Sequence, residues 1–178
     1  MQIHNIDLIG NNLSNYQDIV KKCKEIINEN LQTNGGTLKV SDIFERDFNW
    51  ANLIIAVINN EIIGFALIRQ SNNTHNLKES DFYYYLSDIV VKKDFRNLGI
   101  GKELMKKVIE SRSDAPLVAS VLKDNQASIG LLSKFMKCYG VSMTGRYLRF
   151  VDNKYYNQLY GNTENESLEP YAPSKKSR

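Results

Sequence analysis

The spacing of apolar residues predicts alternating strands and helices along most of the chain. Weak alternation over residues 2–6 predicts a short strand. From Leu13 the apolar positions recur at helical intervals until Asn34-Gly35-Gly36 ends the helix. Ser41 is a candidate cap for a second short helix, with Phe44 and Phe48 on its inner face.

The next part of the chain is rich in β-forming residues. Asn59-Asn60-Glu61 separates two such runs and has the composition of a hairpin turn. The pattern predicts strands over residues 53–58, 62–68, 82–91 and 117–122, helices over residues 101–111 and 126–139, and a closing hairpin of residues 146–151 and 155–159 joined by Asp152-Asn153.

This order of elements predicts a mixed α/β fold in a single domain. A chain of 178 residues has the usual size of one domain and can bury a core without disulfides or metals. We assign the domain to residues 1–160 and expect residues 161–178, which are polar and contain proline, to form a loose tail.

The composition excludes several classes of protein. No apolar run approaches the roughly 20 residues of a membrane helix, and no secretory signal is apparent, so we expect a cytoplasmic protein without membrane contact. Cys23 and Cys138 both lie in predicted helices and are expected to be reduced. With only His4 and His75 added, no cluster has the spacing of a zinc site, and we expect no metal.

The segment between the predicted strand 82–91 and the following helix carries the candidate chemistry. Gly99 and Gly101 allow a tight turn in which several backbone N–H groups converge at a helix N-terminus, a favourable place for a phosphate. The spacing fits neither a Walker loop nor a dinucleotide-binding loop, because Glu103 follows Lys102 and position 104 is leucine. On its own, a Gly-x-Gly is also consistent with a simple strand-to-helix turn.

The motif Arg-x-x-Gly-x-Gly, formed by Arg96, Gly99 and Gly101 after Ile89-x-Val91, resembles the GNAT (GCN5-related N-acetyltransferase) family. The resemblance covers residues 53 to about 151. It implies an α/β fold with a mixed central sheet of about seven strands flanked by about four helices, and acetyl-CoA (coenzyme A) as cofactor.

The resemblance also implies which residues bind the cofactor. The loop would bind the pyrophosphate, the strand before it would pair with the pantetheine arm, and Asn125 matches an asparagine that contacts the cofactor in the family. The residues concerned are Arg96, Asn97, Leu98, Gly99, Ile100, Gly101 and Lys102 for the loop, and Ile89, Val90 and Val91 for the strand. Residues 92–107 contain six basic and two acidic residues, which suits an anionic cofactor but is also typical of a solvated helix face.

Asp88 is the first candidate for the catalytic base. It interrupts an apolar strand directly before the predicted cofactor-binding residues, where a carboxylate could accept a proton through water or hold a cationic amine. Residues 85–91 are similar to a segment of spermidine/spermine acetyltransferases that has two adjacent acidic residues, but Ser87 replaces the first of them. A strand residue bonded to neighbouring backbone is the structural alternative for Asp88.

The general acid departs from the family pattern. The family usually has a tyrosine where this sequence has Leu132, and leucine cannot donate a proton. Ser133, Cys138 and Tyr139 are the nearest alternatives; on a continuous helix Tyr139 would share the face of Leu132, roughly 10 Å away. Protonation by solvent and weak catalysis are the other options.

The sequence therefore predicts an acetyl-CoA-dependent N-acetyltransferase that transfers an acetyl group to a primary amine by direct attack on the thioester. The alternative is a non-catalytic acyl-CoA-binding regulatory module that contacts another protein. The acceptor could be a small molecule or a protein, nucleic acid is not expected, and a homodimer stays open. Acidic residues around the predicted acceptor side outnumber Arg46 and Lys78 and hint at a cationic acceptor: Asp42, Glu45, Asp47, Glu79, Asp81 and Asp88.

Overall fold

The computed structural model describes residues 1–7, 13–34, 51–72, 82–112 and 115–160. Its strands form one seven-stranded sheet in the order β1-β2-β3-β4-β5-β7-β6. Only β4 and β5 pair in parallel; all other neighbours are antiparallel. The strands are β1 (Gln2–Asp7), β2 (Ala51–Ile58), β3 (Glu61–Asn72), β4 (Phe82–Val91), β5 (Leu117–Leu122), β6 (Met136–Val141) and β7 (Tyr147–Asp152). This α/β architecture with a mixed sheet confirms the predicted fold class.

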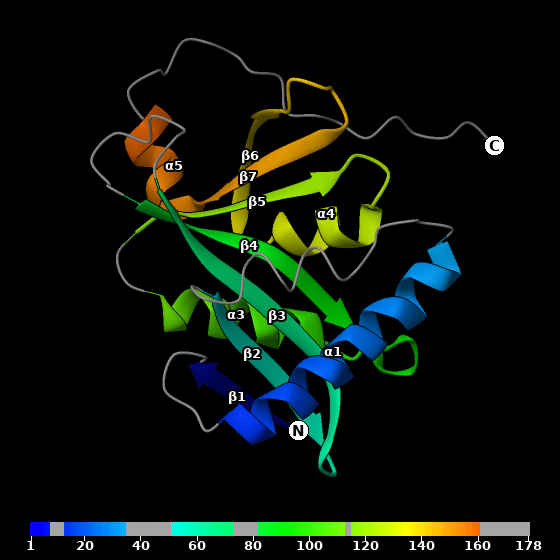
Figure 1. Cartoon of the computed structure of the whole chain (residues 1–178). Helices are drawn as coiled ribbons and strands as arrows, with labels where there is room; N and C mark the ends of the chain where they lie inside the picture. Colours follow the sequence, from blue (N-terminus) through cyan, green and yellow to red (C-terminus); the bar gives the residue numbers. More distant parts are fainter. Residues whose placement is uncertain (8–12, 35–50, 73–81, 113–114, 161–178) are drawn as a thin grey trace, which may run out of the picture.

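The described helices pack on both faces of this sheet (Figure 1). They are α1 (Leu13–Asn34), α3 (Ile100–Ser111), α4 (Gln126–Leu132) and α5 (Asn153–Tyr160), with a 3₁₀ turn η2 (Lys93–Phe95) before α3. The predicted bounds of α1 and of β4 and β5 are confirmed. Within the described ranges, no helix is both long and apolar enough to cross a membrane.

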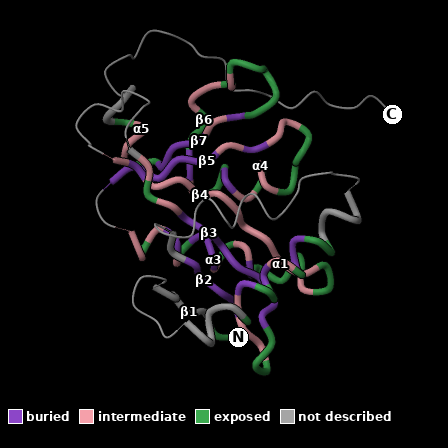
Figure 2. Tube along the Cα trace, in the orientation of Figure 1, coloured by how far each residue is buried: buried purple, intermediate pink, exposed green. Residues whose placement is uncertain are grey.

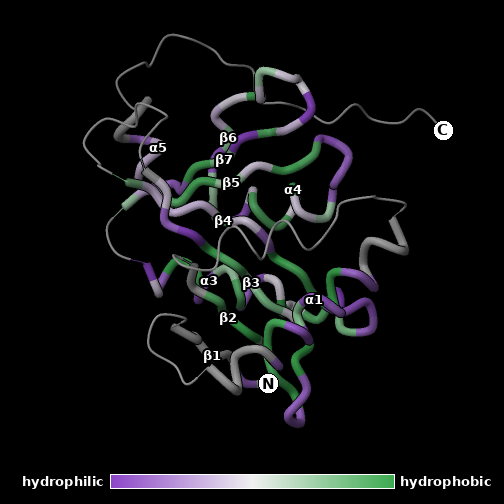
Figure 3. Tube along the Cα trace, in the orientation of Figure 1, coloured by the Kyte–Doolittle hydropathy of each residue, from purple (hydrophilic) through white to green (hydrophobic). Residues whose placement is uncertain are grey.

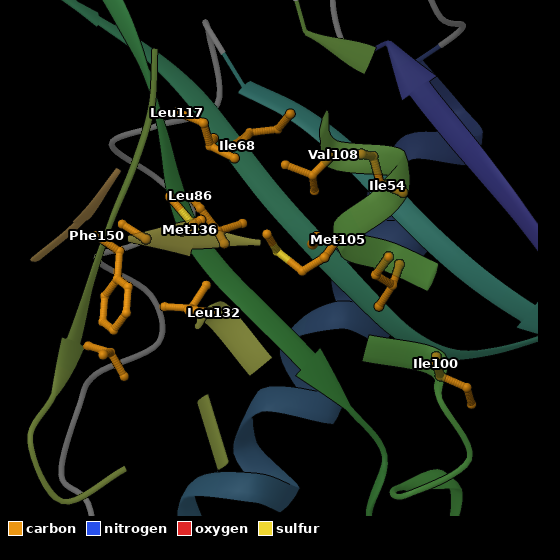
Figure 4. Packing of buried hydrophobic residues seen from close by; sticks show 14 of the residues in the cluster. Ile54, Ile68, Leu86, Ile100, Met105, Val108, Leu117, Leu132, Met136 and Phe150 are labelled. Atoms are coloured by element: carbon orange, nitrogen blue, oxygen red, sulfur yellow. The ribbon is translucent and has the colours of Figure 1, made fainter. Parts of the chain in front are cut away.

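Helical periodicity explains which face each helix covers. The buried positions Val20, Cys23, Ile26 and Ile27 form one stripe of α1 that packs on β2 and β3. A stripe of α3 packs on the opposite face together with residues of α4, where the largest apolar cluster forms (Figure 4). The strands between these layers are the most buried and most apolar part of the fold (Figures 2 and 3).

The turn between β2 and β3 has the chemistry that the sequence predicts. Asn59 and Asn60 both have positive φ, 50° and 64°, as a two-residue type I′ turn requires. Asparagine tolerates this conformation better than most residues. Ile58 consequently pairs with Glu61 at the end of the hairpin.

The prediction of one helix over residues 126–139 is wrong. Helix α4 ends at Leu132, and hydrogen bonds from Ser133, Lys134 and Phe135 back into its last residues close a tight turn. The chain then enters strand β6, which pairs with β7. Met136 belongs to this strand and is buried in the main core. Its apolar side chain fits the helical spacing of the sequence but packs in the core from a β-sheet.

The predicted strand over residues 155–159 is also wrong, because helix α5 occupies this segment. The Asp152 carboxylate accepts a hydrogen bond from the Tyr155 N–H at 3.1 Å, which is the geometry of a helix N-cap rather than of a hairpin turn. The closing hairpin is formed by β6 and β7, whose turn includes Gly145 with φ 70°. Within the described residues the number of strands agrees with the prediction of about seven, but residues 136–141 form a strand where a helix was predicted, and residues 153–160 form a helix where a strand was predicted.

Some predicted features lie outside the described residues. These are the short helix after Ser41, the acidic residues at 42, 45, 47, 79 and 81, and the tail from Gly161.

A buried ion pair joins the C-terminal elements. Asp152 is 3% exposed, and its Oδ2 lies 3.2 Å from Nη1 of Arg112 at the end of α3. The same oxygen accepts a hydrogen bond from the Leu117 N–H at 2.8 Å, where β5 begins. One carboxylate therefore connects α3, β5, β7 and α5.

We predict that Asp152→Ala lowers the free energy of unfolding by about 3–5 kcal/mol, because it leaves the Arg112 guanidinium buried without its counter-charge. Urea denaturation monitored by circular dichroism measures the loss. Asp124→Ala, at an exposed carboxylate, is the control and should change stability by less than about 0.5 kcal/mol. A loss below about 1 kcal/mol for Asp152→Ala would contradict the assigned role of the pair.

The two cysteines should differ sharply in reactivity. Cys23 lies on the buried face of α1, and burial raises the pKa of its thiol to about 12, whereas Cys138 is exposed on β6. Because the thiolate is the reactive form, a thiol reagent such as Ellman's reagent should modify Cys138 in the native protein and Cys23 only after unfolding. Retention of the full native reaction in Cys138→Ser would contradict this assignment.

Candidate functional site

The candidate site is centred where β4 and β5 separate. The two strands pair only over three positions, from Tyr84 with Leu117 to Leu86 with Ala119. Beyond them, β4 continues beside β3 and β5 continues beside β7, so the strands diverge towards their carboxyl ends (Figure 1). Residues 87–91 thus face β5 without pairing to it, and their backbone groups on this side can bind an extended ligand.

A β-bulge lies at the point of divergence. Leu67 pairs with Asp88 and Ile68 pairs with Leu86, so Ser87 is the extra residue in β4. Bulges change the direction of side chains and are frequent next to active sites. The Ser87 Oγ is buried and has no hydrogen-bond partner.

The loop after β4 forms a cradle of backbone donors. Asn97 and Gly99 have φ of 65° and 82°, and Gly99 is the N-cap of α3. The Gly99 carbonyl accepts hydrogen bonds from Lys102 and Glu103, whereas in the described part of the chain the N–H groups of residues 97–101 donate to no protein acceptor. Unpaired donors at the N-terminus of a 12-residue helix match the acceptors and the charge of a pyrophosphate.

The two glycines of the motif have different structural roles. A Cβ at Gly99 would meet nothing within 4 Å, but the φ of 82° is one that side-chain-bearing residues rarely adopt. A Cβ at Gly101 would lie 3.3 Å from Cδ2 of Leu131, so this glycine lets α3 approach α4 closely. Gly99 therefore allows the left-handed backbone at the open side of the cradle, and Gly101 allows α3 to lie close to α4 behind it.

Ion pairs use half of the basic residues around the cradle. Lys92 pairs with Glu61 at 2.6 Å, Lys106 with Glu103 at 2.8 Å, and Lys107 with Glu110 at 3.2 Å. Among the described residues, the three that have no carboxylate partner are Lys93, Arg96 and Lys102. The positive charge available to an anionic ligand is therefore carried by these three side chains, all exposed.

The start of the loop is anchored on both sides. The Arg96 Nε donates a hydrogen bond to the Val91 carbonyl at 3.2 Å, and the Lys92 N–H donates to the Ile63 carbonyl at 2.8 Å. The hydrogen bond to Glu61 and the charges of Glu61, Glu29 and Glu25 raise the pKa of Lys92, although desolvation opposes them. These contacts fix the end of β4, where the loop begins.

Asn125 has a structural role in addition to the predicted cofactor contact. Its Oδ1 accepts a hydrogen bond from the Ser128 N–H at 3.1 Å and so caps α4. The side chain is exposed at the end of the β5–α4 turn. Its amide NH₂ group donates to no acceptor in the described part of the chain and can donate to a ligand.

The structure separates the candidate general acids. Leu132 is 3% exposed and packs with Met136 and Phe150 in the main core (Figure 4). Tyr139 lies on a strand, not on the helix of Leu132, and it packs with Val118 and Val151 on the opposite face of the sheet. The geometric argument that linked Tyr139 to the position of Leu132 is therefore wrong, and Cys138 likewise lies on this strand and not on the helix.

Two residues of this region have a significance that the sequence did not reveal. The sequence singled out Ser87 only as a departure from a family pattern. It could not reveal the bulge, because a bulge depends on how β4 pairs with β3. Arg69 was not singled out, although its guanidinium lies 4.8 Å from the centre of the Tyr85 ring. A lone arginine at the polar end of an otherwise apolar strand was the available signal.

Comparisons with known proteins agree with this geometry. The model of the acetyltransferase (GNAT) family matches residues 20–136. A search of curated proteins found no match. This chain belongs to the GNAT family of acetyltransferases, because the family model covers more than half of its 178 residues. Acetyl-CoA is the cofactor of this family.

Solved structures share the fold at low sequence identity. PH1933 from Pyrococcus horikoshii OT3 is 18% identical, with a TM-score of 0.60 over 85% of this chain and 98% of the other. A GNAT acetyltransferase from Elizabethkingia anophelis with acetyl-CoA bound is 16% identical, with a TM-score of 0.55 over 85% and 96%. The ribosomal-protein-S18-alanine N-acetyltransferase from Escherichia coli is 15% identical, with a TM-score of 0.57 over 84% and 90%.

We predict that Gly99→Trp weakens acetyl-CoA binding by at least about tenfold, because the indole would fill the open space at the cradle. Isothermal titration calorimetry measures the affinity. Gly145→Trp is a matched control, since Gly145 has a similar φ of 70° and also has nothing within 4 Å, but lies in the β6–β7 turn. Equal affinities of the two variants would contradict the assignment of the loop.

Proposed function

We propose that this chain is an acetyl-CoA-dependent N-acetyltransferase in which the β4–β5 gap and the cradle at α3 bind the cofactor together. The observation that carries the proposal is their continuity: residues 87–91, which pair with β3 but not with β5, lead directly into the loop whose N–H groups donate to no acceptor among the described residues. All described strands belong to one sheet, which supports residues 1–160 acting as a single domain.

Each candidate residue then has a defined contact. The N–H groups of residues 97–101 and the side chains of Arg96 and Lys102 would hold the pyrophosphate, and Ile89, Val90 and Val91 would pair through their backbone with the pantetheine arm. Asn125 would donate its amide N–H to the same ligand. The bound cofactor supplies an acetyl thioester, and a backbone N–H near Val91 would stabilise negative charge that develops on the carbonyl oxygen.

Asp88 would prepare the amine for attack. It lies opposite Leu67, which packs under α1, so alternation along β4 places its carboxylate on the α1 face of the sheet. There it would accept the proton that the amine must lose and pass it to water. The amine nitrogen forms the new C–N bond while the C–S bond breaks, and the sulfur keeps the electron pair.

The chain supplies no proton donor at the position of Leu132, so the leaving sulfur would take its proton from water. This same substitution is the observation that favours the alternative, an acyl-CoA-binding module without catalysis. Release of free thiol from acetyl-CoA with a panel of amines separates the two functions. Binding of acetyl-CoA without thiol release would support the non-catalytic module.

We predict that Asp88→Asn lowers kcat by about 100-fold or more at neutral pH, because the general base is lost. The rate of the variant should rise with pH towards the pKa of the acceptor amine, since only spontaneously deprotonated amine reacts. Thiol release across a pH series measures both effects. Asp18→Asn, at an exposed carboxylate on α1, serves as the control; an unchanged pH profile in Asp88→Asn would exclude Asp88 as the base.

A further inference from the structure

The hydroxyl of Ser87 is an unexplained polar group in the centre of the candidate site. Its Oγ is buried and has no hydrogen-bond partner among the residues that the structure describes. Buried polar atoms in native proteins are almost always paired, because an unpaired one destabilises the fold. A partner that arrives with the substrate would explain why the fold retains this group.

The position of Ser87 favours a partner at the reacting centre. It is the bulged residue of β4, directly after the last residue that pairs with β5 and directly before Asp88. Tyr85 packs with the cluster on the α1 side of the sheet, and Leu86 packs on the opposite side. Alternation therefore places Ser87 on the α1 side, as it does Asp88.

A hydroxyl next to a carboxylate is suited to a primary amine. A primary ammonium has three N–H donors, of which the carboxylate can accept one and the serine oxygen, with two lone pairs, another. The third stays available to water. A hydroxyl in this place adds an acceptor without adding a second negative charge.

We propose that Ser87 is an acceptor-binding residue that positions the primary amine beside Asp88. This inference rests on the proposed N-acetyltransferase function. The Ser87 Oγ accepts a hydrogen bond from the amine and holds its nitrogen beside the Asp88 carboxylate.

The test compares Ser87→Ala with Ser87→Thr, which keeps a hydroxyl. For a monoamine that the wild-type protein acetylates, Ser87→Ala should raise KM for the amine by about 10- to 100-fold, as expected for a hydrogen bond to a charged group. Ser87→Thr should recover most of this loss. The affinity for acetyl-CoA should not change, and the thermal midpoint should not fall, because the removed hydroxyl has no partner in the protein.

Ser111→Ala is a matched control, since its hydroxyl is already bonded to the Val108 carbonyl at 3.2 Å on α3. It should leave KM for the amine unchanged. Thiol release with unchanged KM in Ser87→Ala would overturn the role of Ser87 while leaving the proposed function intact. No thiol release from the wild-type protein with any amine would overturn both.

Discussion

The separation of β4 from β5 is the constraint on which the candidate site depends. A parallel pair that continued to the ends of both strands would satisfy its own backbone groups and leave no place for an extended ligand. Here the pairing stops after Leu86 and Ala119, and each strand remains anchored by its other neighbour. The sheet is thus held open from outside, by β3 on one side and β7 on the other.

The same gap determines where the chemistry can occur. The bulge at Ser87 lies at its closed end and the donor-rich loop at its open end, so a ligand in the gap would extend from a carboxylate to a helix N-terminus. The polar groups in this region are therefore distributed by charge: cations and N–H donors gather at α3, whereas Asp88 lies at the bulge. The opening between the strands connects these two environments.

Much of the fold could be predicted from the residues of short, local stretches of the sequence. The Asn59-Asn60 turn, the stripe of α1, and β4 and β5 follow from propensity and periodicity over short stretches. The two errors have a common cause. Residues 136–141 and 153–160 contain apolar positions compatible with either period, and their structure is decided by distant partners: pairing with β7 for the first and capping by Asp152 for the second. The bulge at Ser87 escaped prediction for the same reason, since register is a property of two strands.

The position of β5 has a consequence for how the molecule folds. Strand β5 pairs with β4 over only three positions and otherwise depends on β7, which comes later in the sequence, and the carboxylate that accepts a hydrogen bond from its first residue belongs to Asp152. During synthesis on the ribosome, β1 to β4 can assemble first from mainly neighbouring segments. The strand on the far side of the gap can be placed only when nearly the whole domain is present. The candidate site is therefore completed by long-range contacts, the kind that form late and slow the folding of a domain.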